Sequence, residues 1–298
     1  MPRKPLTGVL CMAYGSPRGA AGIEAYFTHI RGGRQPSEEA LAELRERYKA
    51  IGGVSPLEKI TRAQATALGG RLGLPTFVGM KHAPPFIEEA VAEARAAGVT
   101  RLVGLPLAPH FAQMSFAGYE RPLREAWSGE LVFVNGFHDH PSFTAALRGL
   151  LSETLAYFPP DRVFFTAHSL PARILGEGDD YPGRVTRSVR LLEDRMDLPP
   201  WSVAFQSASQ TGEPWLGPDL LEAIERSGAR KALVCPVGFV ADHLEILYDL
   251  DVEAQAWARQ RRIELRRTPS FNDRSRFIDA LAAVVRDALA LHPAAQRA

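Results

Sequence analysis

Eight short apolar runs alternate with stretches of helical periodicity along almost the whole of this 298-residue chain. Most of these runs have a continuously apolar centre rather than an alternating pattern, which is typical of strands that are covered on both faces. Strands that alternate with helices favour parallel, doubly wound sheets. We therefore predict an α/β protein with strands at 8–14, 76–80, 101–108, 131–137, 162–168, 202–207, 231–237 and 263–267.

The strands fall into two sets of four, one before residue 140 and one after residue 160. The intervening segment 157–161, with its two prolines, is typical of a connection between domains. We predict two Rossmann-like domains, each with a four-stranded parallel sheet, that face each other across a cleft. We assign residues 1–145 to the first and 146–298 to the second, and the last predicted helix, 273–291, can pack back on the first domain.

Charge and cysteine content narrow the class of protein. The formal net charge is +1, which gives no general affinity for polyanions, so we expect no nucleic-acid partner. Cys11 and Cys235 both lie in apolar runs, which favours buried thiols in a reducing compartment over a disulfide framework. No stretch approaches the roughly 18 apolar residues of a membrane span, and the first apolar run is too short for a secretory signal. We expect a soluble, cytoplasmic protein.

One predicted helix, 242–261, carries four carboxylates on one side. At 100° per residue, Asp242, Glu245, Asp249 and Glu253 fall in one narrow stripe, whereas His243 lies more than 90° away and is interpreted as structural. The rest of the helix is largely apolar, so it is expected to be buried, where carboxylates are costly without a cationic partner. A metal ion, a basic partner, solvent in a cleft, or simply a solvated acidic face would each account for the stripe.

His168 ends one of the predicted strands, at the edge where parallel sheets bind ligands. The adjacent Ser169 lacks the G-x-S-x-G turn of a hydrolase nucleophile, and neighbouring strand residues point to opposite faces. A histidine in this place is often structural. Paired with Glu245 from the next strand–helix unit, it would also suit an open divalent-metal site or a proton acceptor near neutral pH. Neither a G-x-G-x-x-G nor a Walker motif is present, so nucleotide binding has no support.

Several motifs together resemble the ferrochelatase family, and the resemblance covers essentially the whole chain. They are AHSLP at 167–171, PWLGPD at 214–219 and GFVADHLEILYD at 238–249, with AYGSP, AYFTHIRGGR, RYKAIGGVSPL and LAPHF in the first half. The chain is most similar to soluble bacterial members that act on coproporphyrin III. The resemblance implies insertion of Fe(II) into coproporphyrin III, which forms Fe-coproporphyrin III (coproheme) in haem biosynthesis.

The resemblance also implies roles for individual residues. His168 and Glu245 would be the catalytic, metal-binding pair, with Asp249 and Glu253 continuing the metal site toward solvent. Porphyrin would contact Tyr14, Arg31, Arg47, Tyr48, Ser55 and Tyr119. Gly32 stands where relatives often carry a second arginine, and Arg34 is a candidate to replace it.

Substrates and partners follow from the same resemblance. We expect no tightly bound cofactor and no iron–sulfur cluster, with ferrous iron and the porphyrin as substrates. We expect a monomer that makes transient contact with neighbouring enzymes of haem synthesis. The alternatives are a protoporphyrin IX ferrochelatase, a cobalt chelatase, and a non-catalytic tetrapyrrole carrier.

Overall fold

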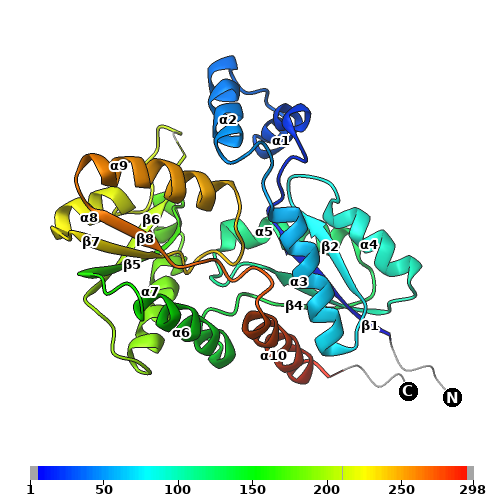
Figure 1. Cartoon of the computed structure of the whole chain (residues 1–298). Coiled ribbons are helices and arrows are strands. Elements are labelled where there is room, and N and C mark those ends of the chain that lie inside the picture. Colours follow the sequence, from blue (N-terminus) through cyan, green and yellow to red (C-terminus); the bar gives the residue numbers. More distant parts are fainter. Residues whose placement is uncertain (1–5, 210, 294–298) are drawn as a thin grey trace.

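Two four-stranded parallel sheets form the framework of the protein in a computed structural model, which describes residues 6–209 and 211–293 (Figure 1). The strand orders are β2-β1-β3-β4 in the first sheet and β6-β5-β7-β8 in the second, so the two sheets have the same topology. The strands are β1 Thr7–Ala13, β2 Thr76–Met80, β3 Arg101–Pro106, β4 Glu130–Phe133, β5 Arg162–His168, β6 Trp201–Gln206, β7 Lys231–Cys235 and β8 Glu264–Arg267.

Helices connect successive strands and cover the sheets. They are α1 Ile23–Ile30, α2 Glu38–Ala50, α3 Leu57–Leu72, α4 Ile87–Ala96, α5 Gln113–Ala126, α6 Pro141–Leu155, α7 Tyr181–Glu193, α8 Leu220–Ser227, α9 Gln255–Gln260 and α10 Ser275–Leu291. Short 3₁₀ turns, η1 Ala20–Gly22 and η2 Ala172–Leu175, precede α1 and α7, and a π-helix, η3 Glu245–Ala254, runs directly into α9.

The predicted fold class is confirmed. Every predicted strand is present, and the bounds of β2 and β5 are those expected from the sequence. Local signals explain the sharp helix ends. The Ser37 hydroxyl accepts a hydrogen bond from the Ala40 amide at the start of α2, and Gly73 adopts the left-handed conformation that ends α3.

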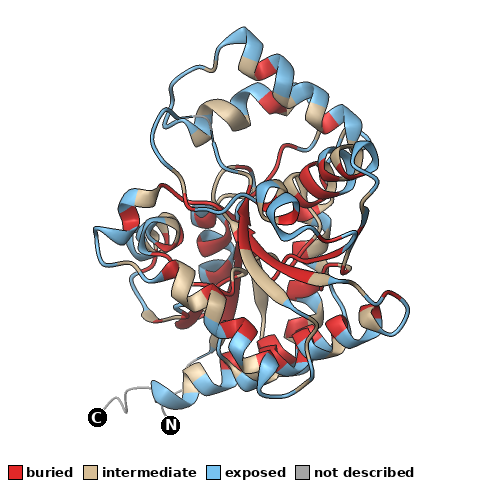
Figure 2. Ribbon diagram, turned by 90° about the vertical axis from the view of Figure 1, so that its left-hand side faces the viewer, coloured by how far each residue is buried: buried red, intermediate tan, exposed pale blue. Residues whose placement is uncertain are grey.

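The two halves share one core. A single cluster of buried side chains contains Val9 and Val103 of the first sheet and also Val163 and Leu233 of the second. Helix α10 packs against both α3 and α6 at the base of the molecule, and the buried faces of helices and strands turn toward this shared interior (Figures 1 and 2). The division at residue 145 lies within α6 and stays a prediction.

Helices α1 and α2 form a separate small lobe that stands beyond the carboxyl ends of the strands (Figure 1). Ile23, Leu41 and Tyr48 make its own small buried cluster, against which Leu244 of the second half packs. Cys11 and Cys235 are buried free thiols. Within residues 6–209 and 211–293, no helix is long and apolar enough to span a membrane.

Candidate active site

His168 and Glu245 meet at the carboxyl edge of the second sheet. His168 is the last residue of β5, and Glu245 is the first residue of η3, which follows the neighbouring strand β7. The Nε2 atom of His168 lies 3.3 Å from Oε1 of Glu245, and both side chains are about one-third exposed. The sequence prediction brought these two residues together from adjacent strand–helix units, and the structure places them in contact.

A close approach of the backbone fixes this meeting point. A side chain at Gly238, in the loop after β7, would lie 2.6 Å from the Cβ atom of Ala167, so the loop can pass beside β5 only as glycine. The Gly238 amide donates to the Thr166 carbonyl at 2.9 Å. Thr166 also donates its hydroxyl hydrogen to the buried Gln206 side chain, whose amide reaches the Glu245 carbonyl at 3.5 Å. The start of η3 is thereby held against the end of β5.

The acidic helix differs from the prediction in its start and its geometry. It is a π-helix that begins at Glu245, and Asp242 lies before it. The Asp242 carboxylate accepts hydrogen bonds from Ser270 and Asn272 and pairs with Arg267 at 3.3 Å, so its inclusion in the stripe was wrong. Glu245, Asp249 and Glu253 remain together, because i→i+5 hydrogen bonding reduces the advance per residue and brings every fourth position closer to one line.

His243 is a site residue that the helical-wheel argument missed. Its Nε2 atom lies 3.3 Å from Oε2 of Glu245, so two histidines contact the two oxygens of one carboxylate. In His243 the Nδ1 atom faces the Ala241 carbonyl, and in His168 it faces the Ser169 carbonyl. When Nδ1–H donates to a carbonyl, Nε2 is the nitrogen left to bind a metal ion or a proton. Metal-binding histidines are commonly oriented in this way.

Charge is concentrated at this pair. Burial alone would lower the pKa of His168, but the Glu245 carboxylate beside it and the more distant Asp249 raise that pKa to about 9. Burial would raise the pKa of Glu245, yet His168 and His243 together hold it well below its usual range. The pair is therefore ionised at neutral pH, with a proton on His168.

Asp249 lies behind the pair, one turn further along η3. It is 9% exposed, its Oδ2 accepts a hydrogen bond from the Ser207 hydroxyl, and its Oδ1 lies 3.6 Å from Nη1 of Arg47. Burial and the charge of Glu245 raise the pKa of Asp249 to about 6, although Ser207 and Arg47 act in the opposite direction. Ser207 has φ 62°, a left-handed conformation that is unusual outside glycine and is often found at functional sites.

The carboxylates lead from the pair to the surface, because Glu253 is exposed at the far end of the row. Within the described parts of the chain, no group of three or more histidine, cysteine, aspartate and glutamate side chains is arranged to hold a metal ion.

Three tyrosines from the first half lie close enough to the His168–Glu245 pair for the charge of Glu245 to affect their pKa values. Tyr14 follows β1 and is 40% exposed, whereas Tyr48 of α2 and Tyr119 of α5 are buried. Burial raises the pKa of Tyr48 and Tyr119, and the charge of Glu245 raises the pKa of all three phenols. Tyr26, which the sequence analysis did not select, donates its hydroxyl hydrogen to the Gly15 carbonyl at 3.2 Å and so steadies the turn after Tyr14.

Lys81 and His82 follow β2 and complete this side of the site. The His82 ring lies 4.6 Å from that of Tyr14, and the Lys81 ammonium lies 5.8 Å from the ring of Tyr14 and 5.6 Å from that of Tyr119. Lys81 runs directly over Gly118 of α5, where a Cβ atom would meet its side chain. Sequence reasoning missed both residues, although their place at the carboxyl end of a strand was a usable signal.

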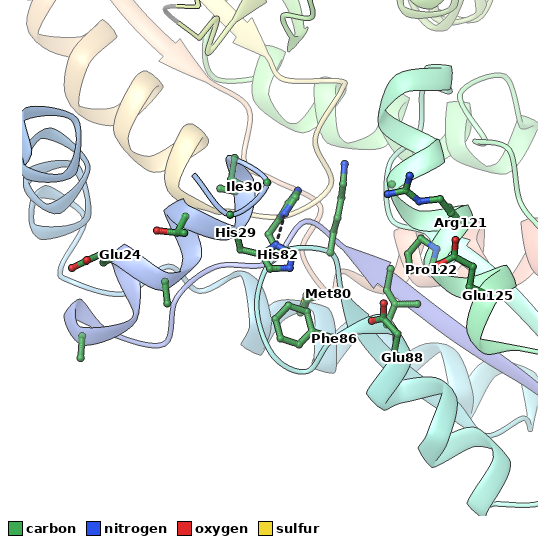
Figure 3. Close-up of a pocket in the computed structure, with 18 residues that line it drawn as sticks. Glu24, His29, Ile30, Met80, His82, Phe86, Glu88, Arg121, Pro122 and Glu125 are labelled. Carbon is green, nitrogen blue, oxygen red and sulfur yellow. Dashed lines mark hydrogen bonds between the residues drawn. The ribbon is translucent and has the colours of Figure 1, made fainter. Parts of the chain in front are cut away.

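A cavity of about 950 Å³ adjoins this wall (Figure 3). His29 of α1 and His82 lie side by side in its lining, with their Nδ1 atoms 3.1 Å apart, and Arg121 of α5 lines another side. Its lining mixes these basic groups with Glu24, Glu88 and Glu125, and it does not include His168 or Glu245.

The remaining predicted porphyrin residues lie around the α1–α2 lobe. Arg31 ends α1 with its guanidinium 5.8 Å from the Phe27 ring, and Arg34 donates to the Arg31 carbonyl. The Ser55 hydroxyl is buried and accepts a hydrogen bond from the Leu57 amide at the start of α3. Tyr48 buries its hydroxyl without a hydrogen-bond partner among the described residues. The contact of these residues with a porphyrin stays a prediction.

The fold is that of known chelatases. The sirohydrochlorin chelatase SirB from Bacillus subtilis subspecies spizizenii superposes with a TM-score of 0.63 at 11% identity, covering 95% of each chain. CbiX, described as the terminal enzyme of sirohaem synthesis in denitrifying bacteria, gives a TM-score of 0.56 at 14% identity, covering 95% of this chain and 99% of CbiX.

Sequence similarity then places the chain within this class. The ferrochelatase family model matches residues 6–289, and the chain belongs to the ferrochelatase family. It is 40% identical to the coproporphyrin III ferrochelatase of Halalkalibacterium halodurans and 39% identical to that of Bacillus subtilis, in each case over 96% of this chain and 98% of the relative. A ferrochelatase of Herpetosiphon aurantiacus is 38% identical over 94% of this chain and 98% of the relative.

Proposed function

We propose that this protein inserts Fe(II) into coproporphyrin III and releases Fe-coproporphyrin III in haem biosynthesis. Membership of the ferrochelatase family supports the reaction, and the names of the two relatives near 40% identity support the substrate. The observation that carries the proposal is the contact of His168 with Glu245, 3.3 Å apart, at the carboxyl edge of the second sheet.

The reaction exchanges one Fe²⁺ for two pyrrole protons, so charge balances only if the site both supplies the ion and removes the protons. We assign the metal-binding role to His168 and Glu245, whose nitrogen and oxygen atoms suit a divalent ion that must be passed on. When His168 gives up its proton, its Nε2 atom can bind the metal or accept a pyrrole proton. Asp249 and the exposed Glu253 extend the anionic path along which the ion reaches the pair.

The first half of the molecule and the α1–α2 lobe would hold the ring. Coproporphyrin III carries four propionates, for which we assign Arg31 and Arg47 as charged donors, with hydroxyls from Tyr48, Ser55 and Tyr119. Hydrogen bonds to charged groups contribute about 1.5–3 kcal/mol each. We assign Tyr14 to the face of the macrocycle opposite His168, with its oxygen as a potential iron ligand in the product.

A side-by-side assay of two porphyrins with Fe(II), under anaerobic conditions, tests the substrate. Protoporphyrin IX has two propionates, so the loss of two charged contacts should lower kcat/KM by at least tenfold relative to coproporphyrin III. Equal or better use of protoporphyrin IX would contradict the coproporphyrin assignment and leave the ferrochelatase reaction intact. Faster insertion of Co(II) than of Fe(II) would favour a cobalt chelatase, and ring binding without insertion of either metal would favour a carrier.

We further propose that the enzyme works as a monomer in the cytoplasm. The two halves share one core within a single chain, and both halves contribute residues to the proposed site, so no second copy is needed to complete it. Sedimentation of the purified protein at micromolar concentration tests the monomer, and a dimer that dissociates only with loss of activity would contradict it.

A further inference from the structure

The α1–α2 lobe touches the second half of the molecule at the π-helix. Helix α2 packs against η3, and Leu244, immediately before η3, inserts beside Tyr48 and Leu41 in the cluster of the lobe. The contact brings a helix that we assign to porphyrin binding directly onto the helix that carries the metal path.

Arg47 is the charged part of this contact, and three groups hold it. Its Nη2 atom donates to Glu43 at 2.9 Å on the same helix, its guanidinium lies 5.0 Å from the ring of Tyr248, and its Nη1 atom lies 3.6 Å from Oδ1 of Asp249. The last distance exceeds that of a hydrogen bond, and a charge-assisted pair in good geometry would be near 2.8 Å. The contact with Asp249 is therefore electrostatic and incomplete.

The negative charge of Asp249 is balanced mainly by this incomplete contact with Arg47. Its Oδ2 is satisfied by the Ser207 hydroxyl, but its buried Oδ1 makes no hydrogen bond among the described residues and has Arg47 as its cation. Glu245 and Glu253 both act on it as like charges along η3. Leaving a buried oxygen such as Asp249 Oδ1 without a hydrogen bond costs free energy. If Arg47 moves away, Asp249 therefore favours the binding of another cation in its place.

We propose that Arg47 is an exchangeable counter-ion: it neutralises Asp249 while the porphyrin site is empty, and it moves to a ring carboxylate when the porphyrin binds, which frees Asp249 for the metal ion. The proposal rests on the proposed function, because it takes Arg47 as a propionate-binding residue. A propionate can offer the guanidinium a bidentate pair at hydrogen-bond distance, which Asp249 does not. Arg47 thereby couples recognition of the ring to the affinity for the metal.

The coupling must be reciprocal. If the ring raises the affinity of the site for a divalent ion, the ion raises the affinity for the ring by the same factor. The increase in metal affinity also depends on the carboxylates of the ring. A ring whose carboxylates are esterified should therefore bind without raising the affinity for the metal. These two consequences distinguish a counter-ion exchange from a residue that only anchors the substrate.

The first experiment uses Co(II) alone as the probe and measures its dissociation constant without porphyrin. The component of binding that is lost in His168→Ala defines the site. Arg47→Ala removes the counter-ion and should tighten this component about fivefold to tenfold, at the lower end of typical coupling because Arg47 is one-third exposed. Arg45→Ala, on the same helix and paired with Glu24, is the matched control and should leave it unchanged. An unchanged or weakened affinity in Arg47→Ala, or no component that depends on His168, would overturn the proposal.

The second experiment adds a ring that cannot take up cobalt, zinc coproporphyrin III, at a concentration shown to be saturating by its fluorescence. It should tighten Co(II) binding in the wild type and in Arg45→Ala, and it should have no effect in Arg47→Ala. Zinc coproporphyrin III tetramethyl ester should leave the wild type unchanged. Equal tightening by acid and ester, or tightening that persists in Arg47→Ala, would refute the exchange. Failure of the wild type to insert iron would refute the proposed function instead, and the Co(II) comparison would still decide the role of Arg47.

Discussion

The two sheets have the same strand order, yet the residues at their equivalent carboxyl ends are chemically different. Tyr14 follows β1 in the first sheet, and His168 ends the equivalent strand β5 in the second. Lys81 and His82 follow β2, whereas the equivalent strand β6 leads to Ser207, which holds Asp249. One framework therefore presents phenols and cations from its first half, and a histidine–carboxylate pair from its second.

The two halves also treat histidine in opposite ways. In the first half, burial lowers the pKa of His82 and of His110 to about 3, with nearby positive charge acting in the same direction. In the second half, Glu245 overrides burial and raises the pKa of His168 to about 9. A contacting carboxylate, rather than position at a strand end, decides whether the histidine is charged. This difference supports the proposed division, in which the second half handles the metal and protons and the first half binds the ring.

The largest expected effect comes from removing the pair in the second half. His168→Ala and Glu245→Gln should each reduce iron insertion by about 10²- to 10⁴-fold, the range for loss of a group that acts directly on proton or metal transfer. Binding of coproporphyrin III, followed by fluorescence, should change by no more than about threefold. A folded His168→Ala protein with normal turnover would remove this residue from the mechanism and with it the division between the halves.

The neutral histidines of the first half should be visible in the dependence of stability on pH. His110 is 4% exposed, its Nε2 atom lies 2.9 Å from Ser188 Oγ, and Ser188 donates to the His138 carbonyl. Because the folded pKa of His110 is below its unfolded value of 6.5, the unfolded chain binds the proton first and stability falls as pH drops from 6.5 toward 3. At pH 5 the loss from this residue is about 2 kcal/mol, at about 1.4 kcal/mol for each pKa unit.

Denaturant unfolding at pH 7.5 and pH 5 measures this loss. His110→Gln keeps a hydrogen-bond donor and cannot titrate in this range, so its loss between the two pH values should be smaller than that of the wild type by about 2 kcal/mol. His292→Gln, at an exposed position, should behave as the wild type does. Equal losses in wild type and His110→Gln would show that His110 is not held neutral.

Much of this arrangement could be predicted from sequence because the signals are local. The centre of the run Arg162–His168 is apolar and the run ends at a polar histidine, so the end of β5 and the place of His168 at the sheet edge follow from it. Ser169 turns away from His168 and donates to the Leu216 carbonyl, as the alternation of side chains along a strand requires. The resemblance to ferrochelatases rested on contiguous motifs, which the family match over residues 6–289 confirms.

The errors arose where distant residues decide local geometry. The start of the acidic helix was misplaced because Asp242 is held by Ser270 and Asn272, about 30 residues further along the chain. The helical wheel assumed an α-helix with 100° per residue, and nothing in the amino-acid sequence of η3 indicates i→i+5 hydrogen bonding. His243 lies before η3, where the helical wheel does not apply, so the wheel did not predict its contact with Glu245. The contact of Arg47 with Asp249 depends on how the α1–α2 lobe packs on η3, which no periodicity encodes.

An intermediate effect is expected from the outer carboxylates of the second half. Asp249→Asn with Glu253→Gln should raise the Fe(II) concentration needed for half-maximal rate by about tenfold, because these residues attract the ion before it reaches His168 and Glu245. The maximal rate at saturating iron should fall by less than about threefold. Asp251→Asn removes a neighbouring carboxylate that pairs with Arg267 instead, and it serves as the control. A loss of maximal rate without a change in apparent iron affinity would contradict the idea of a path.

The smallest effect on rate should come from Tyr14, the first-half counterpart of His168. Tyr14→Phe keeps the ring that contacts His82 and removes only the oxygen, so turnover should stay within about threefold of the wild type. The absorption spectrum of the bound ferric product should nevertheless change, because the phenolate ligand that we propose for the product iron is lost. The spectrum of the bound product and the steady-state rate, measured on the same protein, separate a change in iron ligation from a change in turnover. An unchanged product spectrum would mean that Tyr14 does not bind iron, and a loss of turnover as large as that of His168→Ala would mean that both halves take part in the metal transfer.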